Sequence, residues 1–432
     1  MWAGQERAAG QTGDSGPVTQ AADECFSAEG RLSAIEYREY RPEDAASFLR
    51  LHDSVFPPIS AEFWREFSAH DVTAAVAIAN GEVVGCVPFQ FRQLRLRPGA
   101  TVRVAWEWSV CVREDLRGTG VGSRLMEVAK EFLRGRCAAL AVYRNDEFSP
   151  PYRFYRRAGH HDLLYIRPWV HHGAASASPG RLERWTWGEF LAHEGEALEV
   201  FGEAYAAYGG FPERYLGYYG PAVRSSEYAE VPVELSVLVR RGPHGALAGY
   251  AILGLERLSP ALHLMEIAVR GHDREVALSL LAGLIGAAAE QHVPAVAALP
   301  DSAPACALLA ALGFVPRSRA QSSMVLMLHA LDPEALAGAA WRESPATEGL
   351  AVQAWTPQRH VWLHRACRTP ARQITLELHE EALTRLVSCR LDLTAALSQG
   401  SVTALGADDA TLAAIGQALP PTPWAYHYLD FV

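Results

Sequence analysis

The chain of 432 residues is long enough for roughly two to four globular domains, and its content of 49% hydrophobic and 20% charged residues is ordinary for such domains. Its formal net charge of -10 argues against generic nucleic-acid binding, which depends on lysine and arginine neutralising phosphate. Seven widely spread cysteines without a CxxC pair or a Cys/His cluster predict neither a disulfide framework nor a metal site, and they favour a reducing, cytoplasmic setting.

Residues 1–32 are polar and lack any hydrophobic period, so they are predicted to be a disordered tail. The next segment, to about residue 160, alternates strand and helix patterns, which is typical of an α/β fold. Its expected elements are a strand Ile35–Tyr40, a helix opened by Pro42-Glu43-Asp44, a helix Ala61–Ser68, two strands joined at Asn80-Gly81, a strand Val102–Val112, a helix Ser123–Arg134, a strand Ala138–Tyr143 and a short helix Pro151–Ala158.

After a linker candidate at His171–Gly180 a related order of elements recurs, which suggests a duplicated domain. The expected elements are a helical region Trp187–Tyr205, strands Glu234–Arg240, Ala248–Leu253 and His263–Val269, a long apolar helix Arg274–Glu290, a strand Ala295–Leu299 and a short helix ended by Gly313-Phe314. The long helix holds the longest nearly apolar stretch, which is too short to span a bilayer, so no membrane segment is predicted. From about Pro345 short strands and helices predict a small α+β domain.

The clearest chemical signal lies between Trp106 and Met126. A strand pattern ending at Val112 is followed by Arg117-Gly118-Thr119-Gly120-Val121-Gly122 and then by a helix. Glycines at these positions let backbone N–H groups approach a ligand without side chains in the way, and the helix directs its positive dipole end at the same point. Together with the cation of Arg117, this arrangement suits a diphosphate.

Other interpretations of this turn fit less well. The Walker pattern GxxxxGK[ST] is absent, and the glycines are spaced GxGxG rather than GxGxxG. A flexible turn without a ligand remains open, but three glycines and an arginine at the start of a helix are hard to explain by packing. The pattern Arg-x-x-Gly-x-Gly between a strand and a helix resembles the acetyl-CoA signature of the GNAT superfamily of acetyltransferases.

Further segments extend this resemblance. Phe154–Gly159 looks like the Tyr-x-x-x-Gly segment that closes the GNAT fold, and Leu309–Phe314 looks like the same segment in the second unit. The runs 322–341 and 406–432 resemble those of the enhanced-intracellular-survival (Eis) family of N-acetyltransferases. The resemblance implies an α/β (α+β) architecture with a catalytic GNAT domain at 33–180, a degenerate GNAT domain at 181–335 and a small sterol-carrier-protein-like α+β domain at 336–432.

The resemblance also implies roles for single residues. Backbone groups of Val110 and Val112 would hold the pantetheine arm of acetyl-CoA. The pyrophosphate would be held by Arg117, Gly118, Gly120, Val121 and Gly122. Tyr155 falls where the family has the tyrosine that protonates the leaving thiolate, although its spacing also suits a core aromatic. The carboxylate of Val432 corresponds to the chain end that helps to deprotonate the amine.

Departures from the family pattern concern the acceptor and the second unit. A proline within Ser54–Pro58 stands where the family has an aspartate that contacts the amine, and Val432 follows Asp430-Phe431 as an additional residue. Glu107 is a further candidate, either relaying a proton from the amine through water or lying as a solvated strand residue. In the second unit Asp273–Leu278 replaces the glycine turn, so that unit is predicted to keep the fold without binding CoA.

These residues and the resemblance together predict an N-acetyltransferase that uses acetyl-CoA. The acceptor would be a primary amine, such as a small polyamine, an aminoglycoside or a lysine side chain, which attacks directly in a ternary complex. No metal, nucleic-acid or membrane partner is expected, and the resemblance implies a homo-oligomer, usually a hexamer. The alternative is a non-catalytic acyl-CoA- or lipid-binding protein built on the same folds.

Overall fold

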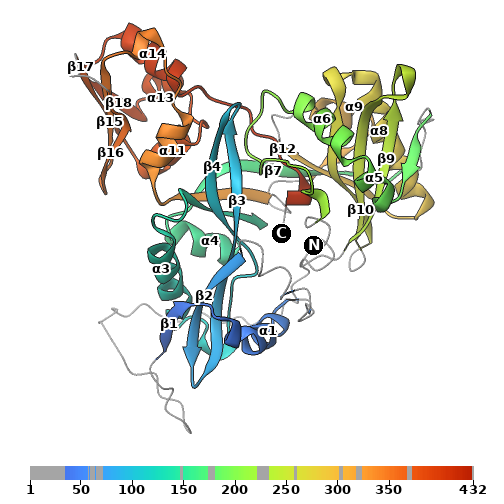
Figure 1. The fold of residues 1–432 in the computed structure, drawn as a ribbon, viewed down its shortest axis with the longest axis horizontal. Helices are drawn as coiled ribbons and strands as arrows, with labels where there is room; N and C mark the ends of the chain where they lie inside the picture. Colours follow the sequence, from blue (N-terminus) through green and yellow to red (C-terminus); the bar gives the residue numbers. More distant parts are fainter. Residues whose placement is uncertain are drawn as a thin grey trace, which may run out of the picture.

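The structure, a computed structural model, describes residues 35–56, 58, 64, 72–145, 149–173, 181–220, 233–256, 260–300, 305–317, 324–366 and 372–430. These residues form a first, a central and a third unit, which run from blue to red along the chain in Figure 1. One 14-stranded sheet extends through the first two units, and a 4-stranded sheet lies in the third. The predicted tail at 1–32 lies outside the described residues.

The first unit follows the predicted order of elements. It comprises β1 (Glu36–Glu39), α1 (Ala45–Asp53), β2 (Val72–Ala79), β3 (Glu82–Arg97), β4 (Ala100–Glu107), β5 (Cys111–Val112), α3 (Val121–Leu133), β6 (Ala139–Asn145) and α4 (Pro150–Arg157). The predicted hairpin is confirmed, with Asn80 (φ 53°) and Gly81 (φ 79°) forming its turn between β2 and β3. The expected helix Ala61–Ser68 lies outside the described residues, apart from the buried Trp64.

The prediction of one continuous strand at Val102–Val112 is wrong, because the strand is interrupted between β4 and β5. Ser109 has a φ of 42°, in the left-handed region, and turns the chain away from the extended path. β4 pairs in parallel with β6 as far as Trp106, whereas β5 pairs with β3. In the described part of the chain, β5 and β6 therefore diverge just beyond Glu107, and α3 begins after this divergence.

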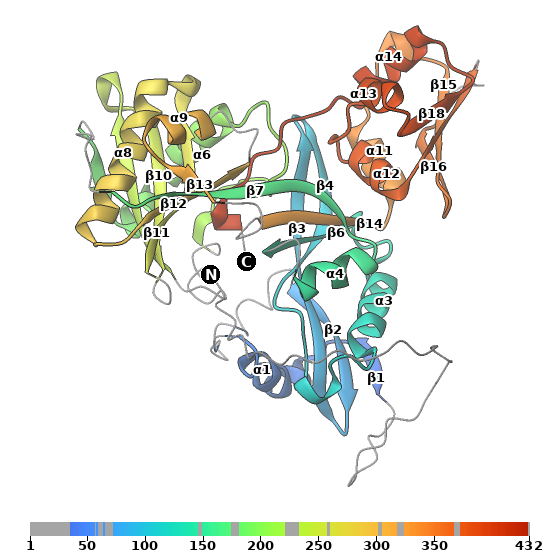
Figure 2. The ribbon, with the colours of Figure 1, turned by 180° about the vertical axis from the view of Figure 1, so that it is seen from behind.

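A long strand joins the first unit to the central unit. β7 (His161–His171) was not expected from the sequence pattern, and it pairs with β14 (Met324–Ala330) on one side and β12 (Ala295–Pro300) on the other. β14 also pairs with β6, so a strand that follows the central unit in sequence lies within the sheet of the first. Figure 2 shows β7 passing from one unit to the other. The sequence-based division at 180 and 335 did not foresee this exchange.

The central unit repeats the order of elements of the first. It comprises β8 (Glu183–Trp185), α5 (Trp187–Ala192), α6 (Glu194–Ala204), β9 (Val233–Arg241), β10 (Leu247–Glu256), β11 (Ala261–Val269), α8 (Arg274–Glu290), β12, α9 (Ala305–Ala311) and β13 (Val315–Pro316). β11 pairs in parallel with β12, as β4 does with β6. The predicted span of the long apolar helix is confirmed by α8, and none of the helices in the described ranges is long and apolar enough to cross a membrane.

The described part of the third unit combines a small mixed sheet with four α-helices. Its elements are α11 (Pro333–Ala340), β15 (Leu350–Trp355), β16 (His360–His364), β17 (Arg372–Leu378), α12 (Glu380–Val387), α13 (Leu393–Ser398), β18 (Val402–Leu405) and α14 (Asp409–Ala418). The strands are ordered β16-β15-β17-β18. The side chain of Asp408 caps α14 by accepting the N–H of Thr411, as its position after the Gly406 turn predicts. The α+β character is confirmed, and the sterol-carrier likeness stays a prediction.

After α14 the chain returns between the first two units and ends its described part in η6 (Tyr428–Asp430), drawn in red in Figure 1. Trp424 anchors this return, because its Nε1 donates to the carbonyl of Leu96 in β3 (3.0 Å). The neighbouring Gly210 has a φ of 88°, and an added Cβ there would lie 2.6 Å from Trp424 Cβ. Only glycine fits this close approach. The C-terminal segment therefore contacts both units.

Candidate active site

The glycine turn lies between β5 and α3. Gly118 (φ 79°) and Gly120 (φ 93°) both adopt the left-handed backbone that favours glycine, and a Cβ added to either would meet nothing within 4 Å. Gly120 is the N-cap of α3, and the first bond of the helix runs from the Arg124 N–H to the Gly120 carbonyl (3.0 Å). The N–H groups of Val121 and Gly122 thus precede the first intrahelical bond and remain for an anion at the helix end.

The turn Arg117–Gly122 thus forms a cradle for an anion, to which Gly122 and Arg117 contribute in different ways. Gly122 lies inside α3, where an added Cβ would lie 3.5 Å from Val112 Cγ2 and 3.6 Å from Phe154 Cε2, which is ordinary van der Waals contact and shows that α3 lies close to β5 and α4 at this point. Arg117 is exposed, and its Nε donates to the Val112 carbonyl (3.1 Å), which fixes the guanidinium beside the turn. Backbone donors, a helix N-terminus and a fixed cation are the groups that a diphosphate requires, so the residues present fit the pyrophosphate of CoA.

The two positions expected to hold an extended arm have different settings. Val110 lies in the break between β4 and β5, and its side chain packs against the core of the first unit. Val112 lies in β5 opposite Gly85 of β3. Because β5 does not pair with β6 in the described residues, the diverging strands leave backbone edges to which an extended chain can add. The binding role of Val110 and Val112 stays a prediction.

Tyr155 lies on α4, which begins at the N-cap Ser149, whose side chain accepts the Tyr152 N–H (3.3 Å). The Tyr155 side chain is buried, and Nη2 of Arg144 on β6 donates to its hydroxyl (3.3 Å) while the guanidinium carbon lies 4.8 Å from the ring centroid. A positive charge beside a phenol stabilises the phenolate that forms when the proton leaves. Sequence analysis missed Arg144, because a lone arginine on a strand carries no local signal.

Glu107 is buried at the end of β4, so the interpretation as a solvated strand residue is wrong. Its Oε1 lies 2.9 Å from Nε2 of His160, and both side chains are fully enclosed. His160 follows Gly159 (φ 83°), which lies just past the C-cap of α4, and its ring lies 5.1 Å from the ring of Tyr155 in an edge-on contact. The site therefore brings Glu107, His160 and Tyr155 together where β4 and β6 begin to diverge. Sequence analysis missed His160, because its partner is 53 residues away.

Other candidate groups lie outside the described residues or do not suit catalysis. Val432 is outside them, and the stretch Ser54–Pro58 is described only in part. No group of three or more His, Cys, Asp or Glu side chains among the described residues could hold a metal ion. Cys86 and Cys111 lie side by side on β3 and β5 with their sulfurs 3.4 Å apart. Their hydrogen bond, together with burial, raises the pKa of the Cys86 thiol, which makes it a poor nucleophile.

The helix that takes the place of α3 in the central unit has a different N-terminus. Asp273 is the N-cap of α8, and its Oδ1 accepts the N–H groups of Glu275 (2.8 Å) and Val276 (3.2 Å). A carboxylate of the chain itself thus occupies the helix end that an anionic ligand would need. The described residues of the central unit therefore supply a physical reason for the predicted loss of CoA binding, beyond the missing glycine turn.

Three solved structures are similar to this chain along nearly their whole length. They are a conserved protein of unknown function from Enterococcus faecalis V583, a probable N-acyltransferase (TM-score 0.68, 14% identity, 91% of this chain and 99% of that one), a GCN5-related N-acetyltransferase from Anabaena variabilis ATCC 29413 (TM-score 0.65, 14% identity, 92% and 100%) and Eis1 from Mycobacterium abscessus (TM-score 0.56, 13% identity, 91% and 98%). At these identities the likeness concerns the fold. No curated protein matches the sequence.

The sequence of the first unit matches a family directly. Residues 35–160 match the model of the acetyltransferase (GNAT) family. The matched segment runs from β1 to His160, so it contains the glycine turn, the diverging strands and Tyr155. The first unit is accordingly a GNAT acetyltransferase domain, and the protein is an acyltransferase.

Proposed function

We propose that the protein transfers the acetyl group of acetyl-CoA to a primary amine at the divergence of β5 and β6. The observation that carries this proposal is the open N-terminus of α3, where Gly118 and Gly120 leave room and Arg117 supplies a cation. Val121 and Gly122 contribute backbone donors to the pyrophosphate. Val110 and Val112 would hold the pantetheine arm, which brings the thioester toward Tyr155.

The transfer proceeds by direct attack of the amine on the thioester. The new C–N bond forms, the C–S bond breaks, and no covalent bond to the protein is needed when both reactants are held together. Tyr155 donates its hydroxyl proton to the departing thiolate. Arg144, in contact with both the hydroxyl and the ring, stabilises the resulting phenolate.

The acceptor is a small polyamine, an aminoglycoside or a lysine side chain. A net charge of -10 suits a cationic acceptor through long-range attraction. The proton that the amine loses passes to a nearby carboxylate, for which Glu107 and the chain end at Val432 are the candidates. The homo-oligomer and the sterol-carrier-like role of the third unit are proposals of the same standing, and light scattering on the purified chain would test the first.

The test uses the full chain, acetyl-CoA, a thiol-trapping dye and a panel of polyamines, aminoglycosides and lysine peptides. We expect CoA release above the rate without protein for at least one class of amine. An Arg117→Ala variant should raise the KM for acetyl-CoA, because it removes the cation of the cradle. Tight CoA binding by calorimetry without release for any amine would overturn the proposal and favour a non-catalytic acyl-CoA-binding protein.

A further inference from the structure

The helix that carries Tyr155, α4, is short and has few buried contacts of its own. It has eight residues, and a helix of this length is marginally stable in isolation. All eight are described, and Tyr155 alone among them is buried, whereas the others are half-buried or exposed. The orientation of α4, and with it the position of the Tyr155 hydroxyl, therefore depends on contacts of its other side chains.

Asp162, at the start of β7, contacts two side chains of α4. Its Oδ2 accepts the hydroxyl of Tyr152 (2.7 Å), and its Oδ1 lies 3.8 Å from Nη1 of Arg156. Tyr152 and Arg156 are four residues apart, so they lie on the same face of the helix. Arg156 also donates to Glu381 of α12 (3.1 Å), but that pair is about one-third exposed and therefore weaker. The side chain of Asp162 is only 8% exposed, so little water competes for its contacts.

The strand that carries Asp162 is fixed within the large sheet. β7 lies between β14 and β12, and Met327 of β14 is opposite Asp162. Tyr165, also on β7, donates its hydroxyl to the same Oδ2 that Tyr152 binds, which orients the carboxylate. Burial, together with the hydrogen bond to Asp162, raises the pKa of Tyr152, so this phenol keeps its proton and remains a donor. Asp162 thus connects a short helix to an inner strand of the sheet.

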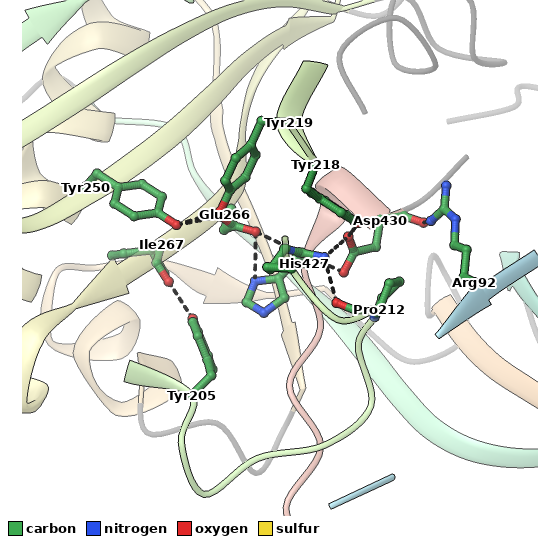
Figure 3. Close-up of polar contacts among 11 residues, drawn as sticks. Arg92, Tyr205, Pro212, Tyr218, Tyr219, Tyr250, Glu266, Ile267, His427 and Asp430 are labelled. Carbon is green, nitrogen blue, oxygen red and sulfur yellow. Dashed lines mark hydrogen bonds and ion pairs between the residues drawn. The ribbon is translucent and has the colours of Figure 1, made fainter. Parts of the chain in front are cut away.

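A cluster in the central unit has a similar composition. Tyr219 and Tyr250 each donate a hydroxyl to Oε1 of Glu266 (2.7 Å), and Nη2 of Arg214 donates to Oε2 (2.8 Å). Figure 3 shows both tyrosines directed at Glu266. Like Asp162, Glu266 is a buried carboxylate with two phenol donors on one oxygen and an arginine beside it. None of its partners belongs to α4, so this cluster offers matched controls.

We propose that Asp162 is a positioning residue for Tyr155, and that its contacts with Tyr152 and Arg156 hold the Tyr155 hydroxyl where it protonates the departing thiolate. This inference rests on the proposed role of Tyr155 as the acid. Asp162 acts through α4 and takes no part in the proton transfer. A misplacement of about 1 Å can lower a rate by about 100-fold, so a small rotation of α4 is enough to slow the reaction.

The experiment measures kcat, KM and the acetyl-CoA Kd of full-chain variants with the best amine of the panel. Asp162→Val removes the acceptor of Tyr152 and should lower kcat by about 30-fold, less than the loss for a displacement of about 1 Å. Asp162→Asn keeps an acceptor oxygen and should recover most of the rate. Tyr152→Phe removes one hydroxyl and should lower kcat by about 5-fold, the worth of one hydrogen bond. The acetyl-CoA Kd should stay that of the wild type in all three, because the cradle lies at α3.

Two controls remove a phenol donor that does not belong to α4. Tyr165→Phe removes the other hydroxyl bound to Asp162, and Tyr250→Phe removes one of those bound to Glu266. Both should lower the free energy of unfolding in urea as Tyr152→Phe does, because each loses a hydrogen bond to a buried carboxylate. Their kcat should stay that of the wild type. A loss of kcat in Tyr250→Phe as large as that in Tyr152→Phe would show that the loss follows general destabilisation, and it would overturn the inference.

The sharpest measurement repeats Asp162→Val in a chain that already carries Tyr155→Phe. If Asp162 acts through Tyr155, no acid remains to be positioned, and the second substitution should leave the kcat of Tyr155→Phe unchanged. A merely structural role would lower kcat by the same factor in both chains, and that outcome would refute the positioning role. If calorimetric titration with acetyl-CoA shows that Asp162→Val is not folded, the same comparison with Tyr152→Phe decides. Absence of any transfer by the wild type would instead refute the proposed function, and this inference with it.

Discussion

Replacing Gly120 by alanine tests the cradle with a single methyl group. Gly120 is the N-cap of α3 at φ 93° and ψ -9°, a backbone conformation that alanine rarely adopts. A Cβ built at this position meets no atom within 4 Å, so the added methyl group clashes with nothing in the protein. The penalty therefore arises from the backbone alone, and it falls on the conformation that aims the N–H groups of Val121 and Gly122 at the pyrophosphate.

The expected magnitude follows from the cost of the left-handed conformation. For a residue with a Cβ this cost is about 1–2 kcal/mol. When the turn of Gly120→Ala relaxes, acetyl-CoA has to restore the strained backbone on binding, so its Kd and KM should rise by about 5–30-fold, at one factor of ten per 1.4 kcal/mol. The amine KM should stay unchanged, because the turn lies at the far end of the cofactor. Calorimetry and steady-state kinetics measure the two constants independently.

Gly81→Ala is the matched control. Gly81 has a φ of 79° in the turn between β2 and β3, and an added Cβ there also meets nothing within 4 Å. Alanine there carries the same kind of backbone penalty at a site that does not touch the cradle. The free energy of unfolding in urea should therefore fall, while the acetyl-CoA Kd stays that of the wild type. Equal acetyl-CoA Kd values for Gly120→Ala and Gly81→Ala would refute the assignment of the turn.

Four further outcomes are expected. Tyr155→Phe should lower kcat by about 100-fold in the thiol-release assay at unchanged acetyl-CoA Kd, and normal turnover would remove its role as the acid. Calorimetry should find one acetyl-CoA per chain, because Asp273 closes the helix end in the central unit; two sites would contradict this. Arg214→Met leaves Glu266 and Asp430 buried without their shared cation, so the free energy of unfolding in urea should drop by about 3–5 kcal/mol, and a change below about 1 kcal/mol would speak against the network. Burial lowers the pKa of His329 to about 3 and that of His427 to about 4, whereas both are about 6.5 in the unfolded chain. Because the unfolded state then binds more protons, the free energy of unfolding should fall as the pH drops below 6.5, by up to about 1.4 kcal/mol per pH unit for each histidine. Urea unfolding between pH 7 and 5 should show that this free energy falls less steeply with pH in His329→Gln than in the wild type.

The cradle could be predicted from the sequence because all its residues lie close together along the chain. Gly118 and Gly120 are required by the positive φ of two residues in one turn, and the helix behind them has its own periodic pattern. The break at Ser109 could not be predicted in this way. A serine with a φ of 42° is held there by the pairing of β5 with β3 and of β4 with β6, and these partners are set by the folded sheet.

The same limit applies to the strand exchange and to the residues around Tyr155. The apolar run at β14 is a plausible strand in isolation, but its neighbours β6 and β7 precede it by more than 150 residues, and no local pattern names them. Arg144 and His160 became candidates only when the fold placed one against Tyr155 and the other against Glu107. Sequence motifs predicted the glycine turn, Tyr155 and Glu107, whereas their partners Arg144 and His160 depend on tertiary pairing.

The central and the first unit differ in how far the polar groups near the helix start and a buried glutamate are paired within the protein. In the central unit the helix end is capped by Asp273 and the buried carboxylate of Glu266 is bound by two tyrosines and an arginine. In the first unit α3 starts at Gly120 without a side-chain cap, and Oε2 of Glu107 has no hydrogen-bond partner among the described residues, which lowers stability unless a ligand supplies the partners. The saturated network also reaches the first unit, because Arg214 binds Asp430, whose carbonyl accepts a hydrogen bond from Arg92 of β3 (3.2 Å). A central unit whose helix start is capped by its own carboxylate thus stabilises a neighbour in which the corresponding helix start is left for the proposed ligand.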